Sequence, residues 1–309
     1  MKKHTFILMI ACCVYLIGCT NKDNGAYWTE SKFCDSKDQC IELGEQYGDL
    51  IFELLEKSFQ YSNRTSFLSV GLETDPFAQD GLLSFDDLVV AKYEKNETGF
   101  QFINGEDDPF HDTLVELINH LLFDGIVEVD YIEFLSDGYP AMSLDEKKLL
   151  FPIYFKQFST ENTLYFIIHE LAHAITLNDG SLFNLCDEKG SIQDCFEENV
   201  YLDAFYKQFW SDLPEKWFAF SYDSMTYQER NDLYETKKEE FVSLYSVVSP
   251  YEDIAESFTH FILSPYNADP KTVAEEKVNF FYQFDELVEY RTYVLQYLKA
   301  TYEEKGSFY

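Results

Sequence analysis

Three residues have the types and spacing to carry out chemistry: His169, Glu170 and His173 form an H-E-x-x-H motif. Positions four apart share one face of a helix, so both imidazoles can reach a single metal ion. Glu170 lies one residue along, where its carboxylate can reach a water molecule at the metal rather than the metal itself. The surrounding segment is apolar on most of its circumference, which predicts a buried helix whose polar groups need partners or a metal. We therefore expect one catalytic Zn²⁺ per chain.

A catalytic zinc usually takes three protein ligands and one water molecule, so a third ligand is required. Asp179 follows the motif closely. Some zincin families place their third ligand at this spacing, with a glycine that lets the chain leave the helix and return to the metal. Here the β-branched Thr176 has that glycine's position and disfavours a positive φ, and Asp179 can also form an Asp-Gly turn that ends the helix. Glu252 follows Ser249 and Pro250, which predict the start of another helix. Because Ser-x-x-Glu is also a capping box, helix chemistry alone leaves both roles of Glu252 open.

Together, the H-E-x-x-H motif and the later segment resemble gluzincin-type zinc metallopeptidases, in particular the lethal-factor-like and Mlc-titration-factor-like enzymes. In that subgroup, a glutamate that opens an E-x-x-A or E-x-x-A-E segment is the third zinc ligand, and a tyrosine seven residues earlier points into the active site. Glu252 opens such a segment here, and Tyr245 has the matching spacing. The resemblance covers residues 120–290. The interval from His173 to Glu252 is longer than we expect for the subgroup, which implies an insertion between the motifs.

The resemblance implies a role for each residue. His169, His173 and Glu252 would bind Zn²⁺. Glu170 would accept a proton from the attacking water and pass it to the leaving amine. Tyr245 would donate a hydrogen bond to the oxyanion of the tetrahedral intermediate.

Carboxylates behind the ligands are expected to orient the imidazoles, and Asp253 and Glu256 are both candidates for this orienting role. His260 is expected to be a helix-surface or core residue rather than a ligand. His111 and His120 are nine positions apart, which places them on opposite sides of a helix and excludes a second site formed by the two.

The N-terminus resembles the leader of a bacterial lipoprotein. Lys2 and Lys3 precede an apolar run over residues 5–17, which has the length of a signal peptide and is too short to span a membrane. Gly18 and Cys19 end this run as in a lipobox, where the chain is cut before the cysteine and the cysteine is lipidated. We therefore predict a signal peptide at 1–18, a flexible tether at 19–30 and a lipid-anchored protein of the bacterial cell envelope that faces the periplasm or the exterior.

Four cysteines remain after the leader and Cys19 are set aside: Cys34, Cys40, Cys186 and Cys195. Export from the cytoplasm favours disulfides. Proximity in the sequence favours Cys34–Cys40 and Cys186–Cys195, while the other two connectivities stay open. The second of these loops would lie in the insertion between the two zinc motifs.

The formal net charge is −33 over 309 residues. This acidity argues against nucleic acid and anionic lipid as partners. The acidic residues are spread along amphipathic segments and form no block that resembles a disordered tail. The expected partners are therefore a protein or peptide substrate and the membrane, the latter through the N-terminal lipid.

The hydrophobic pattern predicts an α+β fold that is zincin-like and mainly helical, with a small mixed sheet before the motif helix. Helices are expected at 38–61, 109–123, from Ser159 or Thr160 to a stop near Gly180, and at 197–209, 227–246, 250–263 and about 272–304. Strands are expected at 127–131 and 149–155, while residues 65–105 give a mixed pattern with turn signals. We divide the mature chain into an N-terminal, mostly helical region at 31–120 and a zincin-like catalytic region at 121–309.

These observations lead to one main hypothesis and one alternative from another class. The main hypothesis is a hydrolase: a zinc metallopeptidase of the cell envelope that cleaves peptide bonds with a metal-activated water. The alternative is a non-catalytic lipoprotein that keeps a zincin fold and acts as a binding or structural protein of the envelope.

Overall fold

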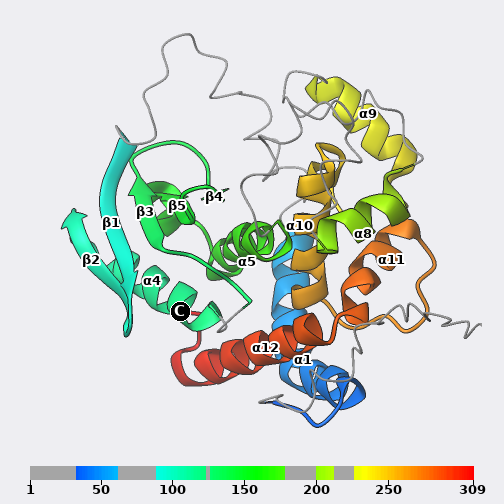
Figure 1. Ribbon diagram of the computed structural model, residues 1–309, viewed down its shortest axis with the longest axis horizontal. Coiled ribbons are helices and arrows are strands. Elements are labelled where there is room, and N and C mark those ends of the chain that lie inside the picture. The colour runs from blue at the N-terminus through cyan, green and yellow to red at the C-terminus, as the bar shows by residue number, and fades with distance from the viewer. Residues whose placement is uncertain (1–32, 62–87, 123–125, 178–199, 212–225) are drawn as a thin grey trace, which may run out of the picture.

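The computed structural model describes residues 33–61, 88–122, 126–177, 200–211 and 226–309. These residues form a mixed α+β fold, with a small sheet on one side and a larger group of helices on the other (Figure 1). The α+β class and the helical character predicted from the sequence are confirmed. The predicted leader, the tether, Cys19, Asp179 and the Cys186–Cys195 pair lie outside the described residues.

The described strands are β1 (Val89–Asn96), β2 (Gly99–Gly105), β3 (Tyr131–Leu135), β4 (Ala141–Ser143) and β5 (Lys148–Pro152). They form one sheet in the order β2-β1-β3-β5-β4. The β3–β5 pair is parallel, and the other neighbouring pairs are antiparallel. The sheet is therefore mixed and precedes the motif helix in the chain, as expected from the sequence.

The described α-helices are α1 (Lys37–Tyr61), α4 (Pro109–Leu121), α5 (Thr160–Thr176), α8 (Val200–Phe209), α9 (Tyr227–Lys237), α10 (Pro250–Leu263), α11 (Val273–Asn279) and α12 (Asp285–Lys305). Short 3₁₀ turns lie at η2 (Ile153–Gln157), η5 (Tyr245–Val247) and η6 (Phe280–Gln283). Of the described helices, none combines the length with the apolar character that crossing a bilayer requires.

The strand predicted at 127–131 begins later than expected, because β3 covers Tyr131–Leu135. Val127 and Val129 are buried, which produces the alternating pattern in the sequence. They nevertheless precede the residues of β3 that pair with the neighbouring strands. Four of the five β3 residues are buried, so this central strand shows no alternation of its own. One of them is Glu133, whose carboxylate lies 2.7 Å from Lys92 Nζ on β1. The β1–β2 hairpin in the mixed region was not predicted either.

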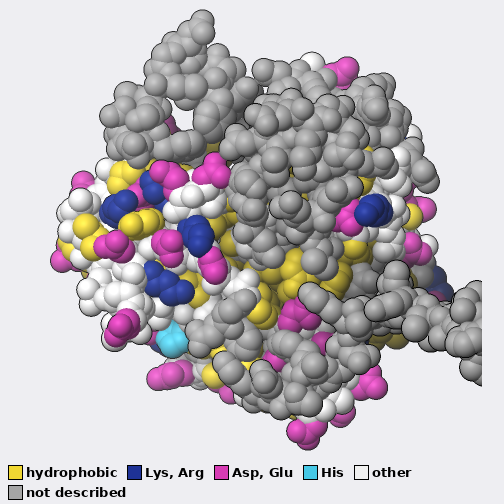
Figure 2. Space-filling model, viewed as in Figure 1, with side chains coloured by type: hydrophobic (Ala, Val, Ile, Leu, Met, Phe, Trp, Pro, Cys, Tyr) yellow, Lys and Arg dark blue, Asp and Glu magenta, His cyan; other side chains and the backbone are white. Residues whose placement is uncertain are grey.

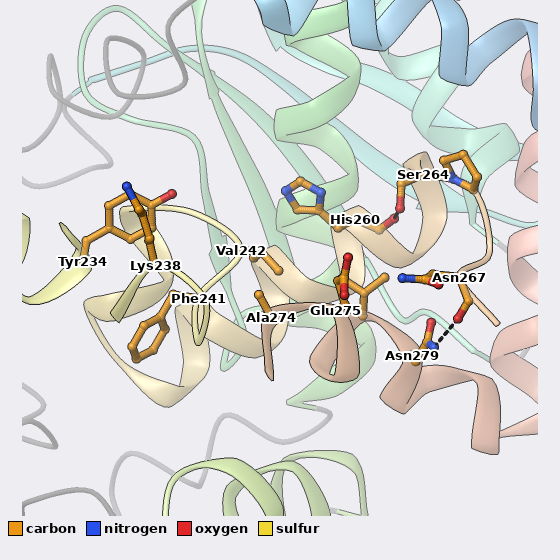
Figure 3. Close-up of a pocket in the computed structure, with 12 residues that line it drawn as sticks. Tyr234, Lys238, Phe241, Val242, His260, Ser264, Asn267, Ala274, Glu275 and Asn279 are labelled. Atoms are coloured by element: carbon orange, nitrogen blue, oxygen red, sulfur yellow. Dashed lines mark hydrogen bonds between the residues drawn. The ribbon is translucent and has the colours of Figure 1, made fainter. Parts of the chain in front are cut away.

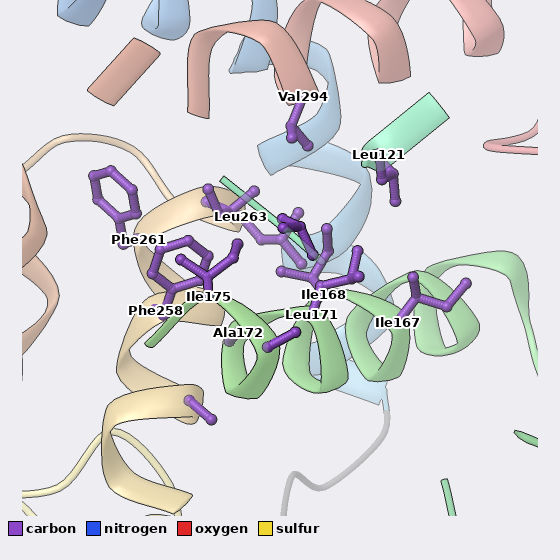
Figure 4. Packing of buried hydrophobic residues seen from close by; sticks show 14 of the residues in the cluster. Leu121, Ile167, Ile168, Leu171, Ala172, Ile175, Phe258, Phe261, Leu263 and Val294 are labelled. Carbon is purple, nitrogen blue, oxygen red and sulfur yellow. The ribbon is translucent and has the colours of Figure 1, made fainter. Parts of the chain in front are cut away.

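The motif helix α5 occupies the centre of the molecule, between the sheet and α10 (Figure 1). Most of its apolar side chains are buried, among them Ile168, Leu171 and Ile175. Figure 4 shows Ile175 beside Phe258 of α10, with Ile168 and Leu171 farther along the helix. Each such side chain contributes roughly 1.5–3 kcal/mol by leaving water. The packing fixes α5 against α10, the two helices that carry the motif and the predicted third ligand.

The helix predicted at 227–246 ends at Lys237. The backbone then leaves the helix because the carbonyl of Glu239 accepts a hydrogen bond from Ala274 N of α11, at 2.9 Å. Phe241 and Leu244 in the following segment are buried, whereas α9 has no apolar stripe that could continue through them.

The long helix predicted at 272–304 is two helices, α11 and α12, separated by η6. Phe280, Phe281 and Tyr282 are consecutive and all buried. A regular helix would point three consecutive side chains in different directions, so the chain turns in order to bury them all. After the turn, α12 runs to Gly306, whose left-handed φ of 73° ends the helix.

The two regions proposed from the sequence share one sheet and one core. Strand β1, before residue 120, pairs with β3 after it, and α1 packs along α12. At the start of α1, Cys34 and Cys40 form the predicted disulfide, with their Cα atoms 5.3 Å apart. This N-terminal segment is therefore joined to the rest of the molecule by packing as well as by the chain.

Candidate metal centre

Helix α5 presents the two histidines of the motif on one face. Ser159 caps the helix by accepting a hydrogen bond from Asn162 N, and is thus the one of the two starting residues left open by the sequence, Ser159 and Thr160, that the structure selects. His169 and His173 are then one turn apart, and their Nε2 atoms lie 3.2 Å from each other. Two imidazole nitrogens at this separation can coordinate the same ion.

Helix α10 brings Glu252 to the same point. Its Oε2 atom lies 3.2 Å from His169 Nε2 and 3.3 Å from His173 Nε2. Zinc binds nitrogen and oxygen ligands at about 2.0–2.1 Å, so the ligands of a tetrahedral site are about 3.3 Å apart. The three measured separations match the edges of that tetrahedron. Two imidazoles and one glutamate are also a donor set of catalytic zinc sites, so these residues fit the metal.

The capping alternative for Glu252 can be compared with two other helices of the same chain. In α9 and α11, the third helical residue is a glutamate whose carboxylate turns back to the backbone of the capping threonine. In α10, Ser249 accepts a hydrogen bond from Glu252 N at 3.2 Å. The Glu252 carboxylate instead contacts the two histidines. The backbone of Glu252 therefore takes part in the cap while its side chain contacts the two histidines of the candidate metal centre.

Electrostatics ties these three groups together. Burial alone would raise the pKa of Glu252, but His173 and His169 outweigh it and hold the pKa of this carboxyl far below its usual range. Burial alone would lower the pKa of His169, but Glu252 and Glu256 raise this pKa well above its ordinary value. A metal ion bound at this point would have to displace a proton from His169.

Glu170 is buried beside the cluster, on the side of the sheet. Burial raises the pKa of its carboxyl, and the nearby histidines oppose that rise. The backbone N–H of Met142 on the edge strand β4 donates a hydrogen bond to it. A carboxyl with a raised pKa, held in place and next to three candidate metal ligands, has the properties of a general base.

Tyr245, the tyrosine chosen by its spacing, lies in η5 with its ring centroid 5.7 Å from that of His169. Two serines flank it in the same segment. Ser243 donates a hydrogen bond to Glu256, and Ser246 contacts Ser243 with the two hydroxyl oxygens 3.1 Å apart. The short segment that carries Tyr245 is therefore linked to α10.

The two carboxylates left unranked by the sequence have different environments. Glu256 Oε1 lies 2.8 Å from His169 Nδ1, and its Oε2 accepts a hydrogen bond from Tyr165 at 2.8 Å. Glu256 is thus placed to orient a ligand. Asp253 points away from the histidines and contacts Lys277 Nζ at 2.6 Å and Trp210 Nε1 at 2.7 Å.

The other described histidines lie apart from the three-residue cluster. The ring of His111 stacks on Phe134 at 3.9 Å, and that of His120 stacks on Tyr297 at 4.7 Å. His260 faces Tyr165 edge to face, with the centroids 6.1 Å apart. The position of His260 agrees with its expected place as a core or helix-surface residue, and His111 and His120 contact different rings.

A pocket of about 360 Å³ lies between α9, α10 and α11 (Figure 3). His260, Lys238 and Asn279 line it, together with apolar residues such as Phe241 and Ala274. Its lining includes none of the three candidate ligands, nor Glu170. It is therefore separate from the candidate metal centre.

Sequence reasoning missed four residues around the site: Tyr165, Ser243, Trp210 and Lys277. Tyr165 could have been found, because it lies four residues before His169 on the same face of α5. Ser243 lies two residues before Tyr245, but no motif connects it to Glu256. Trp210 and Lys277 come from other helices, and no motif connects them to the candidate ligands.

No family model matches this chain, and no curated protein or solved structure matches it either. The functional assignment therefore depends on the residues themselves and on their geometry.

Proposed function

We propose that this protein is a zinc-dependent peptidase of the cell envelope. One observation carries the proposal: His169 Nε2, His173 Nε2 and Glu252 Oε2 form a triangle with sides of 3.2–3.3 Å. Those sides are the ligand separations expected around tetrahedral zinc. The zincin-like fold and the gluzincin resemblance are part of the same proposal.

In this proposal each residue of the candidate site has a defined role. His169, His173 and Glu252 hold the ion and leave a fourth position open. The ion, when bound, supplies Lewis acidity and lowers the pKa of a water molecule towards about 7. Glu170 accepts a proton from water and then donates it to the leaving amine, and its raised pKa suits both transfers.

Two further residues support the reaction. Tyr245 donates a hydrogen bond to the oxygen of the peptide carbonyl as negative charge develops on it. Glu256 keeps the ring of His169 in the orientation that points Nε2 at the ion, because it lies against Nδ1 of the same ring. The substrate class is a protein or peptide outside the cytoplasm.

The test compares Glu170→Gln with the wild type on dye-labelled casein and on a mixed peptide library. We expect the variant to keep its zinc and to lose hydrolysis by about a hundredfold to ten-thousandfold, since only the proton-transferring group is changed. Glu304→Gln is the matched control, because Glu304 is exposed near the end of α12 and should leave activity unchanged. A zinc-loaded wild type that cleaves nothing would instead favour the non-catalytic envelope lipoprotein.

The envelope location has its own test, because it rests on the leader and Cys19 alone. We expect Cys19→Ser to release the protein from the membrane fraction or to block its processing. Unchanged retention in the membrane fraction would refute the lipid anchor without affecting the proposed zinc chemistry.

A further inference from the structure

Lys277 of α11 is a buried lysine that none of the proposed chemistry uses. Its side chain is only 1% exposed, and burying an ammonium group is costly unless it is paired. Its Nζ lies 2.6 Å from Asp253 Oδ2 and 4.0 Å from the centroid of the Phe241 ring. The ammonium therefore has both a carboxylate partner and an aromatic face.

Asp253 joins this lysine to a third helix. It is completely buried, and its Oδ2 also accepts a hydrogen bond from Trp210 Nε1, at the end of α8. One carboxylate oxygen thus connects α8, α10 and α11 at a point inside the molecule.

Asp253 follows the candidate ligand Glu252 in the first turn of α10. Successive residues of a helix project about 100° apart. Glu252 points to the histidines of α5, while Asp253 points to α8 and α11. The two contacts together fix how the first turn of α10 is rotated about its axis.

Charge adds to this geometric constraint. Glu252, Asp253 and Glu256 are three carboxylates within two turns of one helix. Glu256 is balanced by His169, and the metal would balance Glu252. Lys277 balances Asp253 and keeps it directed away from the metal cluster. Without the ammonium, the Asp253 carboxylate would be an unpaired buried anion next to a ligand.

We infer that Lys277 is a positioning residue for the metal ligand Glu252, acting through Asp253. The inference rests on the proposed function, because it requires Glu252 to be a zinc ligand. Loss of the ammonium lets the first turn of α10 rotate, so that Glu252 Oε2 leaves its place between the two imidazoles.

A matched control contacts the C-terminal end of α10. Arg291 of α12 is equally buried, and its guanidinium donates to the carbonyl of Phe261 at 2.7 Å and to that of Ser264 at 2.9 Å. It is also a buried cation that holds α10, but it lies two turns or more away from Glu252. Removing it should weaken the fold without moving the ligand.

The experiment measures the Zn²⁺ dissociation constant of purified Lys277→Met and Arg291→Met by competition with a chromophoric chelator, together with the thermal unfolding of each metal-free protein. We expect Lys277→Met to weaken zinc binding at least about tenfold. Arg291→Met should lower the unfolding temperature but keep the dissociation constant within about twofold of the wild type.

The inference is overturned if Lys277→Met binds zinc as tightly as the wild type, or if both variants lose affinity equally. If Lys277→Met does not fold, Asp253→Asn tests the same contact, since it keeps the shape and the Trp210 hydrogen bond but removes the charge. If Asp253→Asn binds zinc as tightly as the wild type, the inference is likewise overturned. A wild type that binds no zinc would remove the proposed function as well, so the two failures are distinct.

Discussion

At the scale of single residues, His169 is the most constrained side chain of the candidate centre. Its Nε2 faces His173 and Glu252, while its Nδ1 faces Glu256. The two nitrogens would therefore have separate tasks, one towards the proposed ion and one towards the carboxylate of Glu256. Such an arrangement predicts that changes behind the ring will alter metal binding.

We expect Glu256→Gln to weaken zinc affinity by about tenfold to a hundredfold, because an amide holds the His169 ring less firmly than a carboxylate does. Competition with a chelator measures the effect. Tyr165→Phe removes only the hydroxyl group that donates a hydrogen bond to Glu256, and it should weaken zinc affinity less. Equal affinities for Glu256→Gln and the wild type would contradict the orienting role.

The sequence could identify the two candidate histidine ligands but not the residues that support them. The H-E-x-x-H spacing is local, so helix geometry places both imidazoles together without further information. Glu252 was ambiguous, because a capping glutamate and a metal ligand have the same local sequence. Asp253 and Glu256 could not be ranked, since the contacts of Asp253 with Lys277 and Trp210 come from other helices.

At the scale of elements, the site depends on how α5 packs against α10. Both helices begin at serine caps that the sequence indicated, and α10 has the predicted bounds. Elements with strong local signals were therefore predictable. The hairpin β1–β2 and the breaks after Lys237 and at η6 were not, because burial and backbone contacts with distant segments decide them.

We expect Leu171→Ala to destabilise the protein by about 2–5 kcal/mol, since this fully buried side chain of α5 lies in the hydrophobic core and its loss leaves a cavity. Chemical denaturation measures the change in the free energy of unfolding. Val273→Ala on α11 is the control, because Val273 is exposed and should change stability by no more than about 0.5 kcal/mol. A cost for Leu171→Ala as small as that of the control would show that α5 is not part of the core.

At the scale of the whole molecule, the net charge of −33 would give a bound metal ion a structural role besides the proposed catalytic one. Figure 2 shows acidic side chains across the described face, with Lys and Arg gathered mainly over the sheet. Inside the molecule, Glu170, Glu252 and Glu256 lie close together. A bound cation would offset this buried negative charge and so stabilise the fold.

The metal-free and zinc-loaded proteins should respond to pH in opposite directions. The pKa of His169 is raised in the metal-free fold, so its stabilising contribution is complete below the ordinary value of 6.5 and is lost as the pH rises through the raised pKa. Zinc competes with the same proton, so zinc binding strengthens as the pH rises.

Thermal unfolding at about pH 6 and about pH 8, with zinc and with a chelator, measures both trends. The unfolding temperature of the metal-free protein should decrease as the pH is raised from the lower to the higher value. The increase in unfolding temperature that zinc causes should become larger over the same change. Zinc at a thousand times its dissociation constant increases the free energy of unfolding by about 4 kcal/mol. An increase that is independent of pH would show that the metal does not displace a proton from His169.

The central claim is that His169, His173 and Glu252 bind zinc. Elemental analysis of the purified protein, wild type beside Glu252→Ala and Asp179→Ala, tests it most directly. We expect about one zinc per chain in the wild type and in Asp179→Ala, and none in Glu252→Ala. Zinc kept in Glu252→Ala but lost in Asp179→Ala, or a wild type that takes up no zinc when it is supplied, would contradict the assignment.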